Sequence, residues 1–179
     1  YHTSIKNSAS GRVHISYVDY TLGTLKYTTN NSGTWTTTTI DACGNSTGRW
    51  NSLAIGSSSV SGMGTSTVAH IAYFDGINSD LKYATNNSGT WTTATIDSAG
   101  EVGSGAVSLA LDNPGRGHIS YCDYTNMDLK YATNVSGTWV TTTLVSSGAV
   151  GYENSLALDV SGKVHIGYYD GSLRYTTNA

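Results

Sequence analysis

The length, composition and charge of the chain exclude several classes of protein. It has 179 residues, 12% charged side chains and a formal net charge of -3, which fits neither a basic nucleic-acid-binding surface nor an acidic tail. No apolar run approaches the roughly 20 residues of a membrane-spanning helix, and the length suits one domain that buries about two-thirds of its unfolded-chain surface.

The predicted elements are short strands that come in sets. Each run is about five residues long, rich in β-branched or aromatic residues, and bounded by Gly, Asn, Asp or Ser, which is typical of strands. No window keeps the apolar spacing of a helix. In chain order the predicted strands are 4–7, 14–17, 25–29 and 35–40; 52–55, 70–73, 81–85 and 91–96; 108–111, 118–121, 129–133 and 139–144; and 155–158, 165–168 and 173–177.

The sets are copies of one repeat. A histidine opens the second strand of each set, in runs such as HISYVD and HIAYFD, and the copies are 56, 48 and 47 residues apart. We interpret residues 56–69, which lengthen the first step, as a loop insertion. Four antiparallel strands at this period predict an all-β protein, a β-propeller of four-stranded blades. A β-sandwich is one alternative, but it does not require the same turn chemistry at the same offset. A solenoid is another, but its repeats usually carry two or three strands in about half this length.

The expected blades are residues 1–46, 47–98, 99–146 and 147–179, and the last one lacks its outer strand. An unpaired strand edge exposes backbone donors and acceptors, so we expect another copy or a missing segment to complete it. Two copies in an eight-bladed ring and a piece of a six- to eight-bladed protein are both compatible with the repeat. The given sequence starts with Tyr instead of Met, and no charged segment followed by an apolar segment opens it, so a processed or excerpted chain is expected.

The turn between the third and fourth strands carries a recurring motif. In the second copy it reads TNNSGTW, with Thr85, Asn87, Gly89, Thr90 and Trp91 in order. This order resembles the Asp-box of the BNR/sialidase-like superfamily of propellers, although one residue between Gly and Thr is missing. The resemblance implies an Asp-box-like propeller, and small propellers of this kind often act as lectins.

Most of the repeated residues are expected to be structural. Asn and Ser side chains can bond backbone amides in the turn, Gly supplies a positive φ, and Trp packs a large ring between blades. The histidines are expected between blades, hydrogen-bonded to Ser, Thr or backbone groups, because each His–Asp pair is five residues apart and so points to opposite faces of a strand. These structural residues are Gly33, Gly89, Gly137, Trp35, Trp91, Trp139, His14, His70, His118 and His165.

Sialidase activity is not expected. Those enzymes hold a substrate carboxylate with three arginines, and three of the four arginines of this chain lie at matching repeat positions or in turns instead of converging. We therefore expect a protein that is not an enzyme. A glycoside-acting enzyme remains an alternative, since an acidic loop face could supply two carboxylates about 5 to 10 Å apart.

No cofactor or metal is expected. Cys43 and Cys122 form no CxxC motif, and a disulfide between them is left open. The low charge and the Thr- and Asn-rich composition favour a secreted or cell-surface protein.

The loops that differ between copies are the candidate binding site. They precede the first strand of a blade and share a face with the loops between second and third strands, opposite the Asp-box-like turns. Aromatic and acidic side chains in these loops predict a carbohydrate-binding module whose partners are glycans; a structural or adhesive repeat protein is the alternative. The candidate ligand-binding residues are Trp50, Arg49, Tyr152, Glu153, Glu101, Asp19, Asp75, Asp123 and Asp170.

Overall fold

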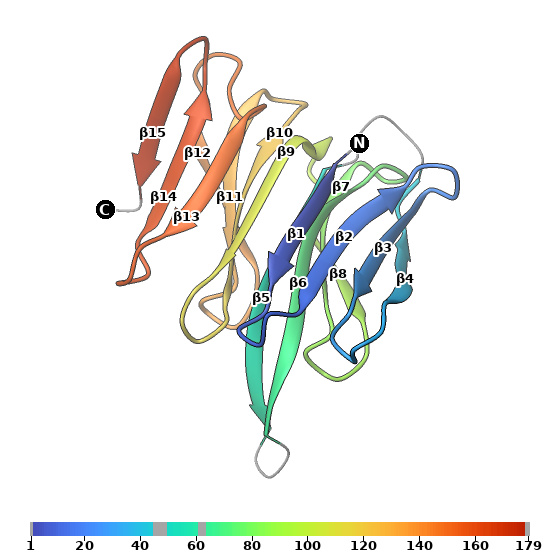
Figure 1. The fold of residues 1–179 in the computed structure, drawn as a ribbon. Coiled ribbons are helices and arrows are strands. Elements are labelled where there is room, and N and C mark those ends of the chain that lie inside the picture. The colour runs from blue at the N-terminus through green and yellow to red at the C-terminus, as the bar shows by residue number, and fades with distance from the viewer. Residues whose placement is uncertain (1, 45–49, 61–63, 178–179) are drawn as a thin grey trace.

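The computed structural model describes residues 2–44, 50–60 and 64–177, and all its regular structure is β-strand. The strands form four antiparallel sheets, named here A to D in chain order (Figure 1). Sheet A contains β1 (Thr3–Asn7), β2 (Val13–Asp19), β3 (Thr24–Thr29) and β4 (Thr36–Ala42). Sheet B contains β5 (Asn51–Val60), β6 (Gly64–Asp75), β7 (Asp80–Thr85) and β8 (Thr92–Asp97). Sheet C contains β9 (Val102–Leu111), β10 (Gly117–Asp123), β11 (Asp128–Thr133) and β12 (Val140–Val145), and Sheet D contains β13 (Asn154–Leu158), β14 (Val164–Tyr169) and β15 (Leu173–Thr177).

The sheets stand side by side as blades of a propeller. Each first strand packs against the next: β1 contacts β5, β5 contacts β9, and β9 contacts β13. Figure 1 shows Sheet D at the left end of the array and Sheet A at the right. The upper face, at the top of that view, holds the loops that precede the first strands and the loops between second and third strands. The predicted all-β propeller is confirmed.

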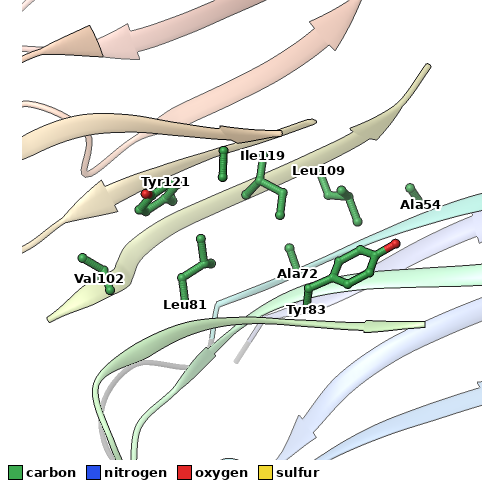
Figure 2. Close-up of a cluster of buried hydrophobic side chains, with 9 residues drawn as sticks. Ala54, Ala72, Leu81, Tyr83, Val102, Leu109, Ile119 and Tyr121 are labelled. Carbon is green, nitrogen blue, oxygen red and sulfur yellow. The ribbon is translucent and has the colours of Figure 1, made fainter. Parts of the chain in front are cut away.

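A leucine at the start of each third strand fixes one sheet to the next. Leu81 of β7 is fully buried in a cluster with Leu109 and Ile119 of Sheet C (Figure 2). Leu25 lies in the equivalent cluster between Sheets A and B, and Leu129 in the one between Sheets C and D. Burying one such side chain contributes about 1.5–3 kcal/mol, so these three contacts are a main source of cohesion between blades.

A polar contact adds to each of the first two interfaces. Asp97, in β8, accepts hydrogen bonds from the Tyr121 hydroxyl at 2.6 Å and from Lys130 Nζ at 2.5 Å, both from Sheet C. Burial opposes ionisation of Asp97, but the bonds from Lys130 and Tyr121 outweigh it and hold the pKa of this carboxyl below its ordinary value. The same contact joins Sheets A and B through Asp41, Tyr73 and Lys82.

The third interface replaces the carboxylate with an apolar group. Val145 has the register of Asp97, because it pairs with Leu129 as Asp97 pairs with Leu81. It packs against the buried cluster between Sheets C and D. The interface between Sheets C and D is therefore apolar at the position where the other two hold an ion pair.

The turns between the third and fourth strands use their Asn, Gly and Trp residues in turn bonds and packing, except that Trp35, expected to pack between blades, is 57% exposed. In the second copy, Asn86 Oδ1 accepts the backbone N–H of Ala69 at 2.8 Å, and Gly89 has a φ of 87°. The Trp91 ring then lies edge-on against Tyr27 of the preceding sheet, with centroids 5.0 Å apart. Gly33 and Gly137 have similar positive φ values, and Trp139 meets Tyr83 in the same way as Trp91 meets Tyr27.

The structure revises one sequence-based interpretation and answers one question left open. Residues 56–60 and 64–69 are strand and not loop, because β5 and β6 stay paired from Asn51–Tyr73 to Val60–Gly64. Their Ser- and Thr-rich residues continue the strand ladder. Cys43 and Cys122 are both free and buried, and burial raises the pKa of their thiols to about 11 and about 12, so neither is a reactive thiolate at neutral pH.

Each repeated histidine bonds a tyrosine, a partner that was not among the Ser, Thr or backbone groups expected. His14 Nδ1 lies 2.5 Å from the Tyr27 hydroxyl on the neighbouring strand, and of the expected partners it has Thr29 Oγ1 at 3.2 Å. The tyrosine stands on the third strand, two residues before the residue that pairs with the histidine, so the partner comes from within the same sheet. The other pairs are His70–Tyr83, His118–Tyr131 and His165–Tyr175.

The described residues contain no helix long and apolar enough to cross a membrane.

Removing the charge of Asp97 will loosen the interface between Sheets B and C. In Asp97→Asn, Lys130 stays buried without its nearest counter-charge, so we expect a loss of about 2–4 kcal/mol in the free energy of unfolding, measured with urea. Asp170→Asn is the matched control, because its pair with Arg174 is exposed to solvent and its loss should change the free energy of unfolding little. Equal losses in the two variants would contradict the role of Asp97.

The buried histidines predict acid sensitivity. Burial lowers the pKa of His70 to about 4 and also lowers those of His14 and His118. Between pH 6.5 and 4 the unfolded chain therefore binds more protons than the fold, so stability falls as the pH is lowered, by roughly 2–3 kcal/mol for His70 alone. Thermal melts across this range should show the decline, with a shallower slope in His70→Gln. A melting temperature that stays constant down to pH 4 would refute this.

Candidate functional site

One ring of equivalent positions on the upper face carries a different side chain in every sheet. Register identifies it: the first-strand residues Ile5, Leu53, Leu109 and Leu156 all pair with the isoleucine of the following strand. Three residues before each of them, at the upper end of the strand, stand His2, Trp50, Ala106 and Glu153. The backbone thus repeats here while the chemistry does not.

All four of these residues line one cavity of about 270 Å³, together with Tyr152. This volume lies just below the roughly 300–1,000 Å³ of typical small-molecule sites. The cavity, called the upper-face cavity below, is also lined by Asn51, Gly105, Val107 and Asn154.

The two aromatic rings of the upper-face cavity are held by neighbours. The Trp50 ring lies 5.5 Å from the His2 ring and edge-on to Phe74 at 6.5 Å, and the Trp50 carbonyl accepts the N–H of Phe74. The Tyr152 ring is edge-on to Tyr124 at 5.4 Å. These contacts position both rings before any ligand arrives.

Most polar groups of the cavity wall are already used by the fold. Asn51 accepts a hydrogen bond from Ser16 at 2.6 Å and donates one to the His2 carbonyl at 2.9 Å. Asn154 accepts from Ser120 at 2.6 Å and donates to the Gly151 carbonyl at 2.9 Å. Both asparagines therefore lock neighbouring sheets together at the cavity wall.

Glu153 carries the negative charge that a ligand in the upper-face cavity can contact. Its side chain is exposed, and within residues 2–44, 50–60 and 64–177 its carboxylate has neither a hydrogen bond nor an ion pair. Of the described residues that line the cavity, it is also the only one with a carboxylate. An unpaired carboxylate beside two aromatic rings can accept hydrogen bonds from hydroxyl or N–H groups of a ligand.

Three of the residues predicted from sequence thus lie together: Trp50, Tyr152 and Glu153. Glu101 is not a lining residue; its backbone bonds Thr125 and Tyr124 beside the cavity. Arg49 lies outside the described residues. Sequence reasoning did not select His2, although aligning the first strands by register would have placed it beside Trp50.

The four predicted aspartates are turn residues. Asp75 is buried, and its carboxylate accepts the N–H of Ile77 at 3.0 Å and the side-chain amide of Asn78 at 2.9 Å. Asp123 is likewise buried and bonds Asn126 in the same way. Asp19 and Asp170 accept backbone N–H groups of their own turns. These carboxylates are used for turn formation, so we leave them out of the candidate site.

Two larger cavities, of about 540 and 520 Å³, lie on the lower face between turns. Among the described residues that line them, none is aromatic, and the carboxylate of Asp112 is already paired with Arg116 at 2.7 Å. In the same ranges no group of three or more His, Cys, Asp or Glu residues is arranged to hold a metal ion. The upper-face cavity is therefore the better candidate.

No protein-family model and no curated protein matches the chain. Its structure is similar to a triple arginine-to-alanine mutant of AofleA from Arthrobotrys oligospora, with a TM-score of 0.68 and 11% identity, over 99% of this chain and 53% of that one. A protein of unknown function from Dyadobacter fermentans has a TM-score of 0.57 and 13% identity, over 93% of this chain and 48% of that one.

A mutant α-L-arabinofuranosidase from Fusarium graminearum, in complex with an iminosugar inhibitor, has a TM-score of 0.55 and 13% identity, over 98% of this chain and 60% of that one. At these identities the likeness shows the fold alone. The chain spans 48% to 60% of the length of these three structures.

Gly105 tests whether the cavity wall is tightly packed. It has a φ of 94°, and an added Cβ would lie 3.3 Å from Tyr152 Cδ1. Gly105→Ala should lower the free energy of unfolding by about 1–3 kcal/mol and change the near-UV circular dichroism of the tyrosines.

Gly115→Ala is the control, because its φ is 87° but a Cβ there meets nothing within 4 Å. It should share the backbone strain and leave the near-UV spectrum intact. An identical spectrum and stability in both variants would show that Tyr152 is not held by this contact.

Proposed function

We propose that the chain is a carbohydrate-binding module and that the upper-face cavity is its binding site. The observation that carries the proposal is the ring of equivalent positions where His2, Trp50, Ala106 and Glu153 differ around one cavity. Repeated residues serve the repeated fold, whereas a ligand that is not four-fold symmetric needs different groups around it.

The lining fits a sugar in size and chemistry. Aromatic rings such as Trp50 and Tyr152 offer large apolar surfaces to the C–H faces of a sugar ring, and they lose little conformational freedom because they are already packed. The carboxylate of Glu153 can accept two hydroxyl hydrogen bonds. A cavity of about 270 Å³ suits one monosaccharide unit better than a long chain.

The similarity of the fold to a known structure supports carbohydrate binding in general, without identifying the sugar. The propeller of the arabinofuranosidase from Fusarium graminearum holds an iminosugar inhibitor, so this architecture can present a sugar-sized site. We propose binding instead of hydrolysis because a glycosidase needs two carboxylates, and Glu153 is the one carboxylate among the described lining residues. Glycans displayed in a secreted or cell-surface setting are the proposed partners.

A glycan array followed by titration of the best sugar tests the proposal. Glu153→Gln should weaken binding by about 10- to 100-fold, because hydrogen bonds to a charged acceptor contribute about 1.5–3 kcal/mol, and Trp50→Ala should weaken it at least as much. Glu101→Gln removes the same charge outside the cavity and should bind like the unmodified chain.

Two results would contradict the proposal. One is the absence of binding to any sugar on the array. The other is an equal effect of Glu153→Gln and Glu101→Gln, which would place the sugar elsewhere. If the chain releases product from fluorogenic glycosides, and Glu153→Gln does not, the chain is a glycoside-acting enzyme and not a binding module.

A further inference from the structure

The outer face of Sheet D exposes side chains whose counterparts are buried. Leu173 starts β15 and pairs with Tyr169, just as Leu25, Leu81 and Leu129 start the other third strands and pair with their second strands. Those three leucines are 0% exposed, whereas Leu173 is 85% exposed.

The next residue on the same face of β15 shows the same difference in exposure. Tyr175 is 61% exposed, and its counterparts Tyr27 and Tyr83 are each 7% exposed. A cavity of about 340 Å³ lies on the same face, lined among others by Ser155, Gly167 and Leu173. Sheet D therefore presents a hollowed apolar face of the kind that the next sheet covers elsewhere in the array.

The outer face of Sheet A shows the complementary set. Ile5 is 62% exposed, while Leu53 and Leu109 at the same register are 0% and 5% exposed. Trp35 is 57% exposed, although Trp91 at the same position packs on Tyr27 of the preceding sheet.

Each exposed group on one face matches one on the other. At all three internal interfaces the third-strand leucine shares a cluster with the first-strand residue of the next sheet, as Leu25 does with Leu53. By this rule Leu173 fits Ile5. The fourth-strand Trp packs on the third-strand Tyr of the preceding sheet, so Trp35 fits Tyr175.

Hydrogen bonding and charge also fit. Ser52 Oγ accepts the N–H of Leu109 on the next first strand at 3.0 Å, and Ser155 stands at the register of Ser52 with its side chain on the exposed face. Lys26 has no carboxylate from a preceding sheet but pairs with Asp19 of its own sheet at 3.1 Å. Covering Sheet A therefore leaves no unpaired ammonium in the interface.

We propose that the outer faces of Sheets A and D are the two halves of one interface, and that a second copy of this chain binds head to tail, Sheet A on Sheet D. The chain aligns over 99% of its length with 53% of AofleA, so that chain is about twice as long, and a second copy supplies an equal length here. Each copy brings one face of each kind, so a closed ring of two copies holds two identical interfaces.

Solution mass tests the proposal. Light scattering after size exclusion should give twice the 18.8 kDa of one chain, and Leu173→Glu and Ile5→Glu should each raise the dissociation constant by about 30-fold or more. Val160→Glu is the control, since Val160 is also an exposed apolar residue but lies in the lower-face turn between β13 and β14. Because both interface side chains are exposed in the single chain, the variants should keep its circular dichroism spectrum.

A compensating pair sharpens the test. The double variant Leu173→Glu with Ile5→Lys places opposite charges across each interface and should recover much of the dimer. An unmodified chain that is monomeric at 100 micromolar (roughly the range where weak specific contacts form) overturns the proposal. So does a dimer that neither single variant weakens, or a mass greater than two copies, which would show that the ring does not close.

Discussion

Burial of one leucine between consecutive blades is the constraint on which the rest of the structure depends. The side chains of Leu25, Leu81 and Leu129 each pack in a buried cluster with residues of the next sheet. These contacts fix the spacing and order of the blades. The buried Asp–Tyr–Lys contacts then set the register between sheets, because an ionised carboxylate without its partners would be costly inside. Leu173 has the same position in Sheet D but is 85% exposed.

This rigid frame lets the upper ends of the first strands vary. Asn51 and Asn154 bond the preceding sheets, so the backbone at the cavity is fixed whatever side chain stands next to them. Trp50 and Glu153 can then face the same cavity although their side chains differ in kind. Separation of fold-bearing and variable positions is what makes a repeat scaffold suitable for ligand recognition.

Much of the fold could be predicted from the sequence because its signals are local and repeated. The period of the repeat, the runs of strand-forming residues and the turn at Gly89 can each be recognised from a short stretch of sequence. The long β5–β6 hairpin was missed because its Ser- and Thr-rich residues read equally well as a loop. The Tyr83 partner of His70 was missed because strand register, which sequence alone does not give, brings the two side chains together.

For the site, the variable loops point to Trp50, Tyr152 and Glu153, which line one cavity, whereas acidity alone points to carboxylates such as Asp75, which bonds its own turn. The most direct test of the account is a crystal structure of the chain with the sugar that it binds best. We predict sugar density in the upper-face cavity, against the Trp50 ring and within hydrogen-bond distance of Glu153. Density on the lower face, with the upper-face cavity holding only water, would contradict the account.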